Sequence, residues 1–280
     1  MKRILTLLFA AALAPGVSRG QVEVACRAAH LRVVYGEPVR VTLDVVNNTG
    51  GQMVFSGPDA NAALRFDVEQ SPDALVPESG EPLLDEPAVI EPGKKLTREI
   101  DLLSKYAIRV SGPYTITARV EWGDKIFISP KVFVDVVPGL EIRRLTVGVP
   151  ALGGAVRVFS LRVLSRNRGE SVFLRVDDEA SGECLGVADL GPIVRLNEPT
   201  IQADEAGGIH VVHQCGPDRF AHNVFDAEGR LAGETRYSST SGGPAAPAAG
   251  EEPGGTAPAA AGHSTIPPPD LSVLESVPAQ

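Results

Sequence analysis

Hydrophobic and polar residues alternate with a period of two through almost every segment between Gln21 and Pro138. A period of two is that of a β-strand with one buried and one exposed face, because successive side chains of a strand point to opposite sides. The clearest runs are 39–45, 64–68, 100–102, 114–120 and 132–136. No stretch of this sequence shows a sustained helical period. The pattern therefore predicts an all-β fold built from short strands.

The breaks between these runs carry residues that favour turns. They are 47–51 (NNTGG), Pro92 with Gly93, 111–113 (SGP) and Gly123 with Asp124. The last pair separates two strand-like runs by only two residues, which predicts a tight hairpin. Residues 70–90 lack the alternation and predict a long acidic loop. Short antiparallel strands over roughly 100 residues are typical of a β-sandwich.

Three stretches carry a resemblance to a known fold: VTLDVVNNTGG at 41–51, Glu91-Pro92-Gly93, and GPYTITARVEW at 112–122. Together they resemble the bacterial immunoglobulin-like sandwich, which implies that fold for residues 21–138. The order of strands and turns is also similar to the small proteinase-inhibitor-type sandwich. That second resemblance implies inhibition of a protease as an alternative function.

A second module is predicted from 139 to 238, beginning at Pro138-Gly139. In the run 156–163 both faces are partly apolar, which predicts a strand covered on both sides. Residues 185–237 predict a single antiparallel sheet, with strands at LGVADLG, PTIQAD, GIHVVHQ, FAHNVFD and RLAGETRY.

Residues 199–231 within this module resemble one blade of secreted bacterial β-propellers. The matching positions are Pro199, Ile201, Asp204, Gly208, His210 and Val212. A blade normally buries its faces against neighbouring blades, and the sequence holds no second copy. The resemblance therefore implies a sheet that packs on the N-terminal sandwich or dimerises.

The two ends of the chain differ from the modules. Residues 1–20 combine a basic start, a short apolar run and a small-residue exit, which predicts a secretory signal peptide and a periplasmic or extracellular location. No stretch reaches the about 20 apolar residues of a transmembrane helix. Residues 239–280 are rich in Pro, Ala and Gly and contain no Lys or Arg, which predicts a disordered tail.

Charge narrows the range of partners. The chain has a net charge of −9, and removing 1–20 takes away three basic residues and no acids, which leaves −12. Nucleic acid needs clustered positive charge, and an anionic lipid surface repels a negative protein. The remaining predicted partner is a protein or a polymer of the cell envelope.

The densest set of chemically active residues is His213, Cys215 and His222, with Cys184 upstream and His210 nearby. Imidazole and thiolate are zinc ligands, so these residues are the candidates for a metal site. Strand alternation places His213 and Cys215 on one face and His210 on the other, which leaves too few converging groups, and we expect no metal and no cofactor. Cys184 and Cys215 are the candidates for a disulfide, and two separately buried thiols are the alternative.

Motifs of catalysis are missing from the sequence. It contains neither a G-x-S-x-G nucleophile elbow nor an H-E-x-x-H zinc motif, and Asp177-Asp178-Glu179 lacks the spacing of a calcium loop. The sequence therefore predicts an exported, non-enzymatic binding or structural protein that uses the loop at 70–90 or its sheet edges. Proteinase inhibition and metal binding by the 210–222 cluster are the alternatives.

Overall fold

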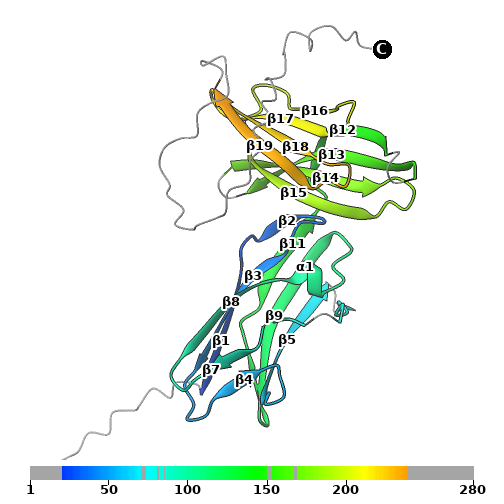
Figure 1. Cartoon of the computed structure of the whole chain (residues 1–280). Coiled ribbons are helices and arrows are strands. Elements are labelled where there is room, and N and C mark those ends of the chain that lie inside the picture. Colours follow the sequence, from blue (N-terminus) through cyan, green and yellow to red (C-terminus); the bar gives the residue numbers. More distant parts are fainter. Residues whose placement is uncertain are drawn as a thin grey trace, which may run out of the picture. The chain divides into compact units, whose positions relative to one another are not determined.

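The computed structural model describes residues 21–70, 74–80, 82–84, 86–149, 153–166 and 169–238. Their regular secondary structure consists of β-strands and one single-turn helix (Figure 1), which confirms the all-β prediction. No helix in them is long and apolar enough to cross a membrane. The expected signal peptide and the expected tail lie outside the described ranges.

The chain divides into two compact units. Among the described residues, the first contains 21–29, 39–107 and 114–134, and the second contains 30–38, 108–113 and everything from 135 onward. The second unit therefore includes two segments from the N-terminal half, which the sequence reading had assigned wholly to the first module.

The first unit is built from two sheets. The smaller sheet has the order β1 (Val22–Ala28), β3 (Arg40–Asn47) and β8 (Lys95–Asp101). The larger sheet has the order β11 (Val132–Val137), β9 (Gly112–Trp122), β5 (Ala62–Gln70), β4 (Met53–Phe55) and β7 (Ala88–Ile90). Two short strands, β6 (Ala74–Leu75) and β10 (Lys125–Ile128), pair with β5 and β9.

Alternation along these strands follows the sequence prediction. Val41, Leu43 and Val45 of β3 are fully buried. Ile116 and Val120 of β9 are buried in the same way. Burying alternate apolar residues on one face of each strand gives the sheets a shared core, because apolar surface removed from water stabilises the fold.

Asp44 is the exception, since it is buried although the alternation of β3 gives its position to the polar face. Its carboxylate accepts a hydrogen bond from Thr97 at 2.7 Å and forms ion pairs with Arg27 at 2.6 Å and Lys95 at 2.9 Å. The Thr97 hydrogen bond, followed by that of Lys95, lowers the pKa of Asp44 below its usual range. A buried carboxylate on the central strand is thus stabilised by partners on the two flanking strands, β1 and β8.

Two short connections illustrate how local sequence decides the path of the chain. The predicted hairpin at Gly123 and Asp124 is confirmed: Trp122 pairs with Lys125, and the φ of Gly123 is +58°, which suits the first position of a type II′ turn. The run 100–102 is not one strand. β8 ends at Asp101, whose Oδ1 accepts the N–H of Leu103 at 3.0 Å and caps the helix α1 (Leu102–Lys105).

The prediction of one long loop at 70–90 is wrong in part. β6 lies within this range and pairs with the end of β5. β7 pairs with β4, and its residues Ala88 and Ile90 are buried. Strands of two and three residues are too short for a period of two to be visible in the sequence.

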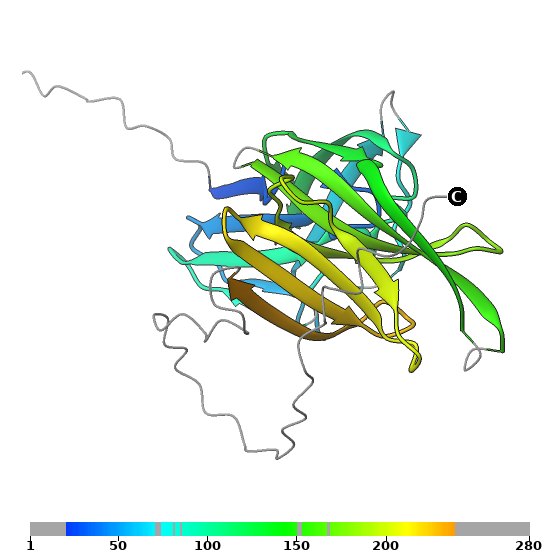
Figure 2. The same ribbon diagram turned by 90° about the horizontal axis from the view of Figure 1, so that it is seen from above.

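The second unit contains two four-stranded antiparallel sheets, in each of which the strands follow one another in sequence. The first has β12 (Leu140–Val149), β13 (Ala155–Arg166), β14 (Gly169–Asp178) and β15 (Cys184–Pro192). The second has β16 (Thr200–Ala203), β17 (Ile209–Gly216), β18 (Arg219–Phe225) and β19 (Leu231–Ser238). Figure 2 shows β17 to β19, in yellow to orange, side by side. Residues 185–191 were predicted to join the second sheet, whereas they form the edge of the first.

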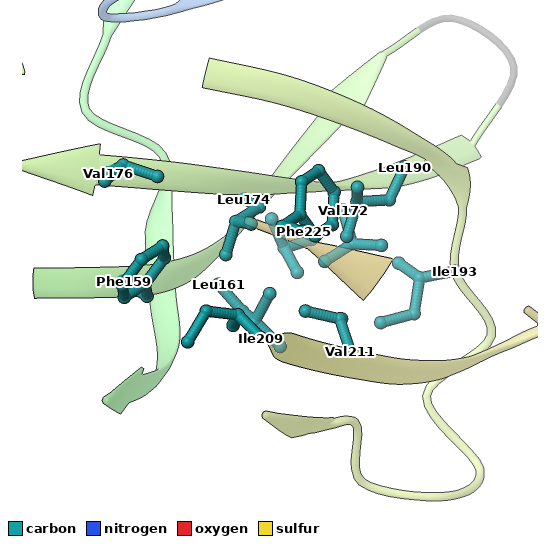
Figure 3. Packing of buried hydrophobic residues seen from close by; sticks show 11 residues of the cluster. Phe159, Leu161, Val172, Leu174, Val176, Leu190, Ile193, Ile209, Val211 and Phe225 are labelled. Atoms are coloured by element: carbon teal, nitrogen blue, oxygen red, sulfur yellow. The ribbon is translucent and has the colours of Figure 1, made fainter. Parts of the chain in front are cut away.

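One core fills the space between these two sheets. Leu161 and Leu174 of the first sheet are fully buried with Ile209, Val211 and Phe225 of the second (Figure 3). The blade-like sheet is therefore covered by the sheet that precedes it in its own unit. The sequence-based expectation of a partner surface did not include this sheet.

β13 and β14 are covered on their other face as well. Leu164 and Phe173 are buried there with Val34, which belongs to β2 (Arg32–Val34) in the 30–38 segment of the same unit. β2 pairs in parallel with the end of β11, where Val34 lies opposite Val137. One face of β13 therefore packs in the core between the two sheets, and its other face packs against Val34. This confirms the prediction of a strand covered on both sides.

Candidate binding groove

A groove lies in the second unit between β15 of one sheet and β18 and β19 of the other. It consists of two adjoining hollows of about 190 Å³ and about 220 Å³, which share Leu190 and Arg236. The first is also lined by Pro192, Cys215, Arg219, Ala221, Tyr237 and Ser238. The second is also lined by Ala188, Asp189, Gly191, Asn223, Phe225, Leu231 and Glu234.

The groove follows from the order of the strands. β15 and β19 are the last strands of their sheets, and each has one paired neighbour among the described strands. At the opposite edges, Arg143 of β12 donates to the carbonyl of Pro199 at 3.3 Å and pairs with Glu198, next to the start of β16. The two sheets are thus in direct contact at the edge formed by β12 and β16, whereas the groove lies at the edge formed by β15 and β19.

The floor of the groove is apolar except for one amide. Leu190, Ala221 and Phe225 are buried there. Asn223 is only 3% exposed, and its Nδ2 has no hydrogen-bond partner among the described residues. A buried polar group without a partner costs about 1–3 kcal/mol, and most buried amides in native proteins are paired. This Nδ2 is an unpaired donor buried just below the floor of the groove, so an acceptor such as a carbonyl oxygen reaches it only if the neighbouring side chains move.

Charges of both signs line the rim. Arg236 donates to Glu234 at 2.8 Å, and Asp189 accepts the N–H of Gly191 at 2.8 Å. Tyr237 stacks on Phe220 with ring centroids 5.6 Å apart, and burial raises the pKa of its hydroxyl. A rim with both signs and an apolar floor suits an uncharged backbone with mixed side chains better than a polymer of one charge.

His213 lies on the core-facing side of β17 and is 1% exposed. Neither of its ring nitrogens has a partner with good hydrogen-bond geometry among the described residues, although the backbone carbonyls of Pro192 and Leu190 lie near the ring. Burial lowers its pKa to about 4, an effect that the nearby carbonyls of Pro192 and Leu190 offset only in part. The ring is therefore neutral at pH 7 and has no partner to which it could pass a proton.

The structure separates four of the candidates for a metal site, Cys184, His213, Cys215 and His222, from one another. Cys184 begins β15, where a Cβ on Gly36 would lie 2.5 Å from its Sγ, whereas Cys215 lines the groove in the other sheet. His213 faces the core, and His222 faces away from it. The described residues contain no group of three or more His, Cys, Asp or Glu placed to hold a metal ion.

Cys184 and Cys215 belong to different sheets of the second unit, and all three cysteines are free thiols in this structure. Neither Cys184 nor Cys215 is fully buried. Burial raises the pKa of Cys26 to about 11 and also raises that of Cys184. A register shift between Gln214 and Gly216 surrounds Cys215, a feature that a period of two cannot reveal.

Comparison with known proteins yields no family. No family model matches the chain, and no curated protein matches it in sequence. Among solved structures, the periplasmic chaperone SfaE is 11% identical over 76% of this chain and 98% of its own, with a TM-score of 0.24. A DUF4784 family protein from Bacteroides caccae is 13% identical over 75% of this chain and 52% of its own, with a TM-score of 0.21. TM-scores this low support no argument about function.

Proposed function

We propose that this protein is an exported, non-enzymatic binding protein of the cell envelope that holds an extended polypeptide segment of a partner protein in the groove. The observation that carries the proposal is the unpartnered Nδ2 of Asn223 in an otherwise apolar floor. A peptide carbonyl is the acceptor that would satisfy this donor without bringing a charge into a buried position.

The edges of the groove suit an extended segment. β15 and β19 each end a sheet, so one side of each strand has backbone groups without a neighbouring strand in the described residues. Such edges pair with an added strand, which gains affinity from main-chain hydrogen bonds and specificity from alternate side chains. Every second side chain of the segment would then face Leu190 and Phe225 on the floor.

Cys215 is the strongest nucleophile among the residues that line the groove, and it is the side chain that would most suggest an enzyme. A catalytic thiol needs a base within hydrogen-bond reach. His213 lies on the same strand, but its ring nitrogens have no partner in the described residues and burial holds the ring neutral. These features favour binding over catalysis.

Export is proposed from the leader-like residues 1–20, and the net charge of the remainder supports a protein partner over nucleic acid. Proteinase inhibition, the alternative from the N-terminal resemblance, requires one exposed loop that enters a protease cleft. Residues 70–90 give it little support, because β6 and β7 tie this range to the sheets.

The test uses linear peptides of about ten residues, the length of a long strand, selected from a displayed library on the full chain. Binding of a selected peptide is measured by fluorescence anisotropy. Asn223→Leu should weaken it at least tenfold, since it removes the donor, which corresponds to about 1.4 kcal/mol. The same variant should unfold at an equal or higher urea concentration, because it also removes an unpaired buried amide.

Gln202→Leu is the matched control, since this amide is exposed on β16 and lies outside the groove. It should leave peptide binding unchanged. Equal binding by the native chain, Asn223→Leu and Leu190→Arg would overturn the proposal, as would a library from which no peptide is selected.

A further inference from the structure

His210 and His222 lie side by side on the outer face of the sheet β16–β19. His210 is opposite Val224 and His222 is opposite Val212, so the two histidines are diagonal neighbours on adjacent strands. Nδ1 of His210 is 2.9 Å from Nε2 of His222, and the rings are stacked with centroids 5.1 Å apart. Neither histidine belongs to the groove on the other side of the sheet.

Asp204 fixes the orientation of the first ring. Its Oδ2 is 2.9 Å from Nε2 of His210, and its Oδ1 accepts the N–H of Gly208 at 2.7 Å. The carboxylate is thus held by the turn between β16 and β17. A carboxylate accepts only, so it keeps the proton of neutral His210 on Nε2 and leaves a lone pair on Nδ1, directed at His222.

We propose that Nδ1 of His210 and Nε2 of His222 together bind one divalent transition-metal ion, with Asp204 as the positioning residue and water as the remaining ligand. Imidazole nitrogens bind zinc at about 2.0–2.1 Å, so two of them on a tetrahedral ion are roughly 3.4 Å apart. The observed 2.9 Å requires only a small separation of the rings. A carboxylate behind a ligating histidine is a common arrangement at metal sites.

Proton balance requires one change at His222. In the structure its Nε2 faces a nitrogen that holds a lone pair, so Nε2 carries the hydrogen of the bond. When the metal binds, the Nε2–H bond breaks and an N–H bond forms at Nδ1 through exchange with water. The ring stays neutral, and no net proton is released.

The site is accessible from solvent. The side chain of His210 is 27% exposed and that of Asp204 is 41% exposed, so an ion reaches the pair from solvent. Of the residues that the sequence suggests as metal ligands, His210 and His222 form this pair, whereas His213, Cys184 and Cys215 lie outside it.

The first experiment titrates the full chain with Ni²⁺ and with Zn²⁺ by calorimetry, with the thiols kept reduced. We expect one ion of either metal to bind per chain. His210→Ala and His222→Ala should each weaken binding at least tenfold, a loss of about 1.4 kcal/mol. His30→Ala, which removes an exposed histidine of the same unit, is the matched control and should bind like the native chain.

Absence of stoichiometric binding to the native chain would overturn the site. Native-like binding by His210→Ala or His222→Ala, with unchanged circular dichroism, would overturn it as well. Because neither histidine lines the groove, these outcomes leave the peptide-binding proposal to its own test.

Asp204→Asn tests the positioning role. The asparagine oxygen still accepts from Gly208, but its amide would donate to Nε2 of His210 and hold the ring proton on Nδ1, where the metal binds. We expect a 10–100-fold loss of affinity, the usual range for such partners. Nitrogen chemical shifts of His210 should report the exchanged tautomer without metal. Unchanged shifts and unchanged affinity would refute the role of Asp204.

Discussion

Glu37 and Arg166, 129 residues apart in the sequence, form an ion pair in which both side chains are about nine-tenths buried. Oε1 of Glu37 accepts from Nη2 of Arg166 at 2.6 Å, and Oε2 accepts the N–H of Val34 at 2.9 Å. The guanidinium also lies 4.8 Å from the centroid of Phe173. The pair therefore fixes the 30–38 segment to the sheet β12–β15 within the second unit.

Replacing Glu37 with Gln should destabilise the second unit. Removing one partner of a buried ion pair leaves the other charge uncompensated, which costs about 3–5 kcal/mol. A carboxylate oxygen of Asp189 lies 3.5 Å from the guanidinium of Arg166 and partly balances its charge, so we expect a loss near the lower end of this range. Urea unfolding measures the free energy, and Glu183→Gln, a change at an exposed glutamate of the same unit, should leave it within about 0.5 kcal/mol. Equal stability of the two variants would contradict the prediction.

His213 should make the stability of the second unit depend on pH. Its pKa is lowered from 6.5 to about 4 in the folded protein, so the unfolded chain binds the proton more readily. Protonation of His213 therefore does not lower the free energy of unfolding above pH 6.5. It lowers it progressively as the pH falls from 6.5 to about 4, and it causes no further change below pH 4. At 1.36 kcal/mol per pH unit the loss is about 3 kcal/mol.

His213→Leu isolates this effect from the carboxylates that titrate in the same range. The native chain and the variant are unfolded in urea across the pH range, and the difference between them is compared. We expect the leucine variant to gain stability relative to the native chain as the pH falls. A constant difference from pH 7 to 4 would show that His213 is accessible to protons in the folded state.

Several parts of the fold are predictable from the sequence because they depend on local physics alone. The burial of Val41 and Leu43 follows from the alternation of side chains along a strand. The hairpin at Gly123 follows from a two-residue connection that contains glycine. Neither requires knowledge of which strand lies next to which.

Other parts depend on pairing, which a pattern of single residues does not encode. The alternation of residues 185–191 is equally compatible with pairing to β14 or to β16. In the structure they pair with β14. The groove depends on that choice, since β15 is its wall. Nothing in the sequence indicates that the side chain of Asn223 lacks a hydrogen-bond partner. That depends on which residues surround it, among them Leu190, which lines the same hollow.

Cys215 should be the most reactive thiol of the folded protein. It lines the groove, whereas Cys26 is buried and its pKa of about 11 keeps it protonated. Burial also raises the pKa of Cys184, and thiolate is the reactive form. A short pulse of iodoacetamide followed by peptide mass spectrometry should find the label on Cys215 first, and a selected groove peptide should slow it. Faster labelling of Cys26, or no protection by the peptide, would contradict this.

Gly229 and Gly207 lie in turns with the same hydrogen-bond pattern. Replacing each with alanine distinguishes backbone strain from steric overlap as causes of destabilisation. In both turns an aspartate N–H donates to the carbonyl four residues on, from Asp226 to Arg230 at 2.9 Å and from Asp204 to Gly208 at 2.9 Å. The φ angles are +81° and +87°. A Cβ on Gly229 would lie 2.5 Å from Cγ2 of Val176, whereas nothing lies within 4 Å of one on Gly207.

Alanine at either position meets the left-handed backbone, which costs about 1–2 kcal/mol. Gly229→Ala also forces β14 and the turn apart, and overpacking of this kind adds about 1–3 kcal/mol. Urea unfolding should therefore rank the native chain above Gly207→Ala and Gly207→Ala above Gly229→Ala. Equal loss of stability in the two variants would contradict this prediction. It would mean that Val176 moves aside without a loss of free energy and that the turn 226–230 does not pack tightly on the first sheet of its unit.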